Sequence, residues 1–133
     1  MREMKEMRGI SRLVLYVFGA YNMIFGAIAV ISPSITAVLY SVPEVTPEWS
    51  GAARWVGAFA VAIGYGAFSA VKTGNKEMLK LLVISAYAMM IATIFSVFKG
   101  EASIFNVSFD FIIQAALVIA LYTTGKKNSR YNF

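Results

Sequence analysis

Four long apolar stretches, separated by polar or proline-containing segments, make up most of this 133-residue chain. They run over about residues 13–31, 51–71, 78–98 and 104–124, and a longer connection covers residues 32–50. A bilayer core about 30 Å thick needs about 20 apolar residues per helix, which is the length of each stretch. The pattern therefore predicts a single all-α domain over residues 1–133, a polytopic membrane protein whose four transmembrane helices form an up-down bundle.

Capping residues mark the ends of these stretches. Thr46 followed by Pro47 combines a helix N-cap with proline at the first helical position, so the second helix is expected to begin near Pro47. Asn75 and Ser103 are typical caps for the third and fourth helices. Gly125 is expected to end the fourth helix.

The connection after the first stretch contains an apolar segment over residues 34–42, which is too short to cross a bilayer. We expect it to lie in the outer interface or to dip back as a short helix. Tyr40, Trp49 and Trp55 fall near the same boundary, where membrane proteins place aromatic side chains.

Basic residues indicate the orientation. Lys and Arg gather before residue 13, over residues 72–80 and in the tail over residues 126–130, whereas residues 34–50 contain neither. By the positive-inside rule, both termini are expected in the cytoplasm, with the protein in the plasma membrane. The net charge of +5 is therefore interpreted as a topology signal and not as evidence for nucleic-acid binding.

The composition mainly excludes certain classes of protein and of chemistry. Apolar residues make up 59% of the chain and charged residues 14%, which is too apolar for a small soluble domain. Because the chain contains neither Cys nor His, thiol chemistry, Ser-His-Asp hydrolysis and the usual haem or zinc sites are excluded. No cofactor or metal is expected.

Small residues at regular spacing predict where helices approach each other closely. The first stretch has two glycines seven residues apart, and the second has small residues at four-residue spacing on more than one face. Such positions let helix backbones come close together in lipid. The predicted packing positions are Gly19, Gly26, Gly57, Ala58, Ala62, Gly64 and Gly66.

A few polar residues lie inside the apolar stretches, where charges are costly and usually face the protein interior. Arg54 and Asp110 each lie about two turns from the outer start of their helix, so we expect an ion pair between them. Gln114 follows Asp110 by one turn on the same helix face. The candidate ligand-binding residues are Arg54, Asp110, Gln114, Asn22, Tyr21 and Tyr87.

Three interpretations of this polar group stay open. It can be interhelical hydrogen bonding that fixes register, a polar pocket that opens outward, or part of a proton relay. A relay needs acidic groups across the whole membrane, and the inner halves of the four stretches contain none.

The layout resembles the DoxX-like group of small four-helix membrane proteins. The residues that carry the resemblance are Phe18-Gly19 through Pro33, Arg54-Trp55-Val56-Gly57-Ala58 and the late acid Asp110. The resemblance implies a four-helix up-down bundle. It also implies a loose link to quinone or sulfur-compound redox complexes, or no known role, with Arg54, Gly57 and Asp110 as the positions that correspond.

These features predict a membrane protein that binds a small molecule, lipid or quinone in an outward-facing polar pocket, or an accessory subunit. The alternative is a small oligomeric transporter that uses Asp110 as its coupling carboxylate. An enzyme is the least favoured class of protein, because no second acidic residue, set of metal ligands or nucleophile accompanies Asp110 in the sequence. The expected partners are membrane lipids, a lipid-like or quinone ligand, and a second copy or a larger membrane complex, with no nucleic acid.

Overall fold

The computed structural model describes residues 9–127, and all regular structure in this part of the chain is helical. Four helices are long and apolar enough to cross a membrane, and a short fifth helix lies between the first two of them. The helices are α2 (Ile10–Ile31), α3 (Pro33–Leu39), α4 (Pro47–Thr73), α5 (Lys76–Phe98) and α6 (Ile104–Lys127). The predicted all-α fold with four long apolar helices is confirmed.

The predicted N-caps of α4 and α5 are confirmed by hydrogen bonds. The backbone N–H of Trp49 donates to Thr46 Oγ1 over 3.1 Å, with Pro47 at the first helical position. The backbone N–H of Glu77 donates to Asn75 Oδ1 over 3.0 Å. These side chains satisfy N–H groups that have no partner within the helix.

The prediction that Gly125 ends the last helix is wrong, because α6 continues through Lys127. One glycine inside a helix costs only about 1 kcal/mol and ends the helix only where the chain adopts a left-handed conformation. Gly74 does adopt that conformation, with φ 64°, and it ends α4.

The short apolar segment of the first connection forms α3, as the sequence predicted. Pro33 starts it, and the backbone N–H of Tyr40 donates to the carbonyl of Thr36 at its end (3.1 Å). Tyr40 is half-buried and not directed into open solvent. The end of α3 therefore directs the Tyr40 hydroxyl toward the long helices.

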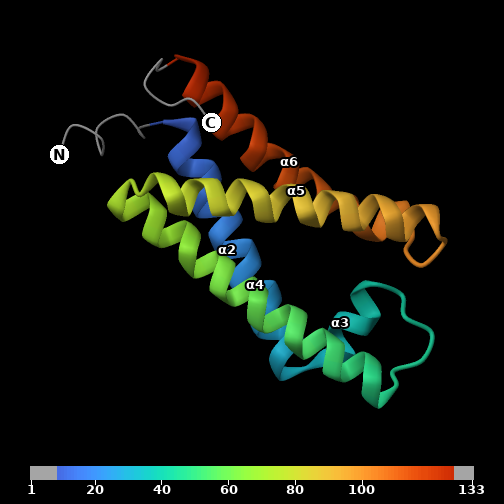
Figure 1. The fold of residues 1–133 in the computed structure, drawn as a ribbon. Coiled ribbons are helices and arrows are strands. Elements are labelled where there is room, and N and C mark those ends of the chain that lie inside the picture. Colours follow the sequence, from blue (N-terminus) through green and yellow to red (C-terminus); the bar gives the residue numbers. More distant parts are fainter. Residues whose placement is uncertain (1–8, 128–133) are drawn as a thin grey trace.

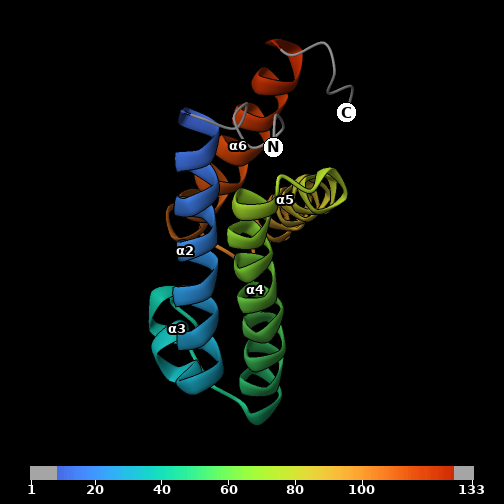
Figure 2. The ribbon, with the colours of Figure 1, turned by 90° about the vertical axis from the view of Figure 1, so that its left-hand side faces the viewer.

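The four long helices form two hairpins. In Figures 1 and 2, α2 and α4 lie side by side along their length, and α5 leaves the end of α4 at a steep angle. The turn from α5 to α6 lies on the same side as α3, above it in the view of Figure 1, and α6 runs back toward the beginning of α2. Ser11 Oγ of α2 donates to the carbonyl of Ala120 in α6 over 3.2 Å. The hairpins thus meet at one end and diverge at the other.

The core lies where the two hairpins meet. It contains side chains from all four long helices, among them Leu15, Ala67, Leu82 and Leu117, each at most 2% exposed. Many other large apolar side chains are exposed, including Phe98 at 90% and Phe105 at 89%. This outward apolar surface suits a chain whose solvent is lipid.

The contact between α2 and α4 rests on two pairs of facing glycines. A Cβ added to Gly64 would lie 2.6 Å from the carbonyl oxygen of Gly19, and one added to Gly57 would lie 2.7 Å from that of Gly26. Only glycine allows two backbones to approach this closely. Ala58 and Ala62 lie exposed on another face of α4.

Gly66, the remaining small residue predicted to pack, is buried against α5. A Cβ added there would lie 3.3 Å from Met78 Sδ, which is the end of a flexible side chain. This contact is looser than the glycine pairs between α2 and α4.

We expect Gly64→Val to lower the free energy of unfolding by about 1–3 kcal/mol, because the side chain must push α2 away. Gly51→Val is the matched control, since a Cβ at Gly51 meets nothing within 4 Å. Unfolding in mixed detergent micelles, followed by circular dichroism, measures both. Equal stability of the two variants would contradict the close contact.

Candidate functional site

A cavity of about 240 Å³ lies between the two hairpins. Residues of α2, α4, α5 and α6 line it, together with Tyr40 directly after α3. Its wall is mainly aromatic and aliphatic, with Phe18, Phe25 and Phe59 among the lining residues. The polar residues that line it are Tyr21, Asn22, Tyr40, Ser85, Asp110 and Gln114.

A hydrogen bond between Tyr40 and Asp110 joins the first connection to α6. The Tyr40 hydroxyl donates to Asp110 Oδ2, and both residues are half-buried. Burial raises the pKa of Tyr40 to about 12, so this hydroxyl stays protonated and remains a donor near neutral pH. The carboxylate is thereby held at the cavity wall with acceptor positions to spare.

Gln114 lies one turn deeper than Asp110 on α6 and is 3% exposed. Its Oε1 is buried and has no hydrogen-bond partner among the described residues. An unpaired buried acceptor costs about 1–3 kcal/mol. A donor that reached this oxygen from the cavity would remove the cost.

Asn22 is buried on α2, and its Nδ2 donates to the carbonyl of Phe18 over 2.8 Å. Its amide is therefore anchored to its own helix. Tyr21 beside it is half-buried and packs against other rings. The cavity thus receives one amide from α2 and one from α6.

Aromatic rings surround the Asp110 side of the cavity. The ring of Tyr21 lies 6.0 Å from that of Phe25 and 5.5 Å from that of Phe109, measured between centroids. The ring of Phe25 lies 5.7 Å from that of Tyr40. Tyr40 therefore belongs both to this aromatic group and to the hydrogen bond with Asp110.

The expected ion pair between Arg54 and Asp110 does not form. Arg54 Nη1 donates instead to the carbonyl of Val30 over 3.1 Å, near the C-terminal end of α2. A guanidinium suits this position, because the last carbonyls of a helix lack partners and carry partial negative charge. Equal depth along two helices does not fix how each helix is rotated, and the rotation of α4 turns Arg54 away from the cavity.

Two sequence-predicted candidates thus lie outside the cavity, and two of the polar residues that line it were missed. Arg54 lines a separate groove with Trp55 on another face of α4, and Tyr87 is 48% exposed. Tyr40 and Ser85 were not predicted. The dipping segment of residues 34–42 held the signal for Tyr40, but nothing in the sequence indicates which way Ser85 points.

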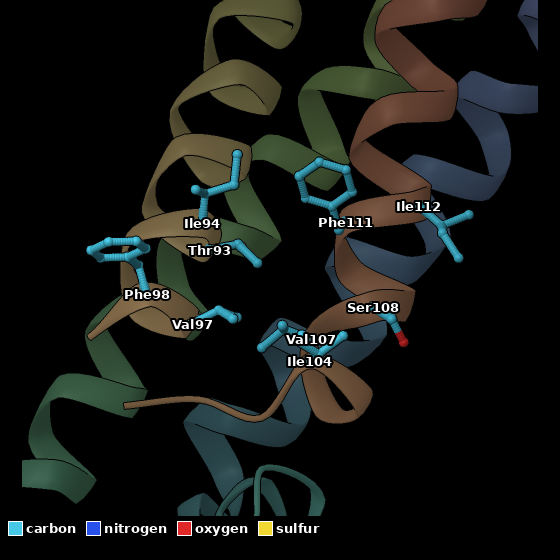
Figure 3. A pocket seen from close by; sticks show the side chains of 9 residues that line it. All are labelled: Thr93, Ile94, Val97, Phe98, Ile104, Val107, Ser108, Phe111 and Ile112. Atoms are coloured by element: carbon cyan, nitrogen blue, oxygen red, sulfur yellow. The ribbon is translucent and has the colours of Figure 1, made fainter. Parts of the chain in front are cut away.

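A second hollow, of about 380 Å³, lies between the last turns of α5 and the first turns of α6. Figure 3 shows Thr93 and Val97 on the α5 side and Phe111 on the face of α6 that looks toward α5. The Ser108 hydroxyl is already bonded to the carbonyl of Phe105 (3.0 Å). The lining of this hollow is almost wholly apolar and offers little polar chemistry.

Comparisons with known proteins and the arrangement of possible metal ligands assign no function to this chain. No protein-family model, curated protein or solved structure matches this chain. Within residues 9–127, no three His, Cys, Asp or Glu side chains lie close enough to hold a metal ion. Functional argument therefore rests on the cavity itself.

Two double-mutant cycles test the observed partners of Asp110. Tyr40→Phe and Asp110→Ala should be coupled by about 0.6–1.7 kcal/mol in unfolding free energy, as measured for hydrogen bonds inside membranes. Arg54→Ala and Asp110→Ala should add within about 0.5 kcal/mol, because these residues share no contact. Coupling between Arg54 and Asp110, with none between Tyr40 and Asp110, would instead support the ion pair expected from the sequence.

Proposed function

We propose that this chain is a multi-pass plasma-membrane protein that binds an amphiphile, such as a lipid or a quinone, in the cavity between its two hairpins. The observation that carries the proposal is Gln114, a buried amide with an unpaired oxygen, beside a carboxylate in an otherwise apolar wall. Ligand sites have this composition, with a mostly apolar lining and a few placed polar groups.

A purely structural role accounts for part of the polar group but not for all of it. Tyr40 is bonded to Asp110, and Asn22 is bonded to its own helix. Polar residues that serve only to hold helices together are expected to find partners within the protein. The unpaired oxygen of Gln114 is what favours a ligand over structural bonding.

The size of the cavity supports an amphiphile that enters only in part. At about 240 Å³ it is smaller than most sites for drug-sized ligands, which occupy about 300–1,000 Å³. It holds a polar head group and the first part of an apolar body. The rest of the body would lie in the bilayer, which the exposed apolar faces of the helices contact.

Further assembly fits the same proposal. Only 11% of the apolar window of α5 is buried within the chain. Its free face contacts lipid, a second copy or another subunit of a membrane complex. Membership of the DoxX-like group, with its link to quinones, belongs to this proposal as well.

We also propose that both termini lie in the cytoplasm. Because the chain has no cysteine, single-cysteine variants report one site at a time. A membrane-impermeant maleimide should label Val45→Cys in intact cells and Thr73→Cys only after permeabilisation. The reverse pattern would contradict the orientation without affecting the cavity.

Native mass spectrometry of the full chain, gently released from its membrane, tests the ligand proposal. We expect a retained amphiphile on the wild type and at least tenfold lower occupancy on Ser85→Phe, which fills the cavity from α5. Ala88→Phe, on the exposed side of the same helix, is the control and should keep the ligand. If the wild type neither retains an amphiphile nor binds an added one, the proposal is contradicted.

A further inference from the structure

The charge balance of the cavity narrows the kind of head group that it can take. Asp110 is the charged residue in its lining, and the residue accepts a hydrogen bond from Tyr40. Within the part of the chain that the structure describes, the ion pair that forms lies elsewhere, between Lys80 and Glu77. The carboxylate therefore stands at an apolar wall with no cation of its own.

A second observation points in the same direction. The ring of Phe25 contacts those of Tyr21 and Tyr40 on the Asp110 side of the cavity, at centroid distances of 6.0 Å and 5.7 Å. Ring faces carry partial negative charge and attract cations, most strongly where water is excluded. Carboxylate and rings together form a surface suited to positive charge.

A third observation concerns hydrogen bonding. Gln114 Oε1 needs a donor, and Asp110 keeps acceptor positions beyond the one that Tyr40 uses. A quinone or an ester brings acceptors only and leaves this oxygen unpaired. A phosphate or a fatty-acid carboxylate adds negative charge beside Asp110, which is unfavourable at low dielectric.

We propose that the cavity binds an amphiphilic organic cation: a protonated primary or secondary amine on an apolar body. The ammonium group would donate to Asp110 and Gln114 and lie against the rings of Tyr21 and Phe25. Charge-assisted hydrogen bonds of this kind are about twice as strong as neutral ones. This inference rests on the proposed ligand-binding function and narrows its ligand from amphiphiles in general to amines, which excludes quinones and lipids that have no amine.

Four amphiphiles with the same twelve-carbon chain separate charge from hydrogen bonding. They are dodecylammonium, dodecyltrimethylammonium, 1-dodecanol and dodecyl sulfate, offered in competition to the full chain in maltoside micelles at neutral pH. Native mass spectrometry then reports each bound mass directly. Alkylamines are protonated at this pH, as the side chain of lysine is.

We expect dodecylammonium to bind at least tenfold more tightly than 1-dodecanol, and dodecyl sulfate to bind least. Dodecyltrimethylammonium should fall between the first two, since it keeps the charge but has no N–H for Gln114. Equal binding of dodecylammonium and 1-dodecanol, or preference for the sulfate, would overturn the inference. Equal binding of the two cations would overturn its hydrogen-bonding part.

Asp110→Asn tests the role of the charge, because asparagine keeps the size and can still accept from Tyr40. Dodecylammonium should lose at least tenfold in affinity and fall to the level of 1-dodecanol. Glu101→Gln removes the same charge from the exposed turn before α6 and should change nothing. Unchanged dodecylammonium affinity in Asp110→Asn would contradict the inference.

Phe25→Leu is a second variant, which keeps the Asp110 carboxylate. It tests the inference independently if Asp110→Asn does not fold. It should lower the affinity for both cations severalfold while that for 1-dodecanol stays within twofold. An equal loss for all three would show that the rings supply only apolar contact. If none of the four amphiphiles binds the wild type, the proposed function itself fails; if they bind without preference for cations, only this inference does.

Discussion

The arrangement depends first on the close contact of α2 and α4 at two levels of facing glycines. Lipid tails are as apolar as the helices, so helices in a bilayer associate through close packing and not through the hydrophobic effect. Gly19 opposite Gly64 and Gly26 opposite Gly57 set both the distance and the rotation of this pair. Any larger side chain at Gly57 or Gly64 would meet backbone atoms, which cannot move aside.

That rotation decides which polar groups meet. With its glycines turned toward α2, α4 presents Val56 and Ala60 to the cavity and carries Arg54 on the other flank. Arg54 therefore donates a hydrogen bond to a carbonyl near the end of α2, and Asp110 accepts one from the hydroxyl of Tyr40. The same constraint that packs the first hairpin thus leaves the Asp110 carboxylate bonded to a hydroxyl and not to a cation.

The divergence of the two hairpins separates the buried core from the cavity within one small chain. Their common end contains the buried core, where Leu15, Ala67, Leu82 and Leu117 pack together. Their diverging ends contain the cavity, where buried polar groups replace part of that packing. A cavity costs packing energy. The glycine contact and the core, which shares Phe18 with the cavity wall, stabilise the helices beside it.

Local sequence alone predicted the four long helices and their caps at Thr46 and Asn75. It also placed Asp110 and Gln114 one turn apart on the same helix. Those features follow from local spacing and hydropathy, which act within one segment. Only the tertiary structure decided that Arg54 faces the end of α2 and that Tyr40 reaches Asp110. Both depend on how whole helices are rotated against each other, which backbone contacts between distant segments set and no single stretch of sequence contains.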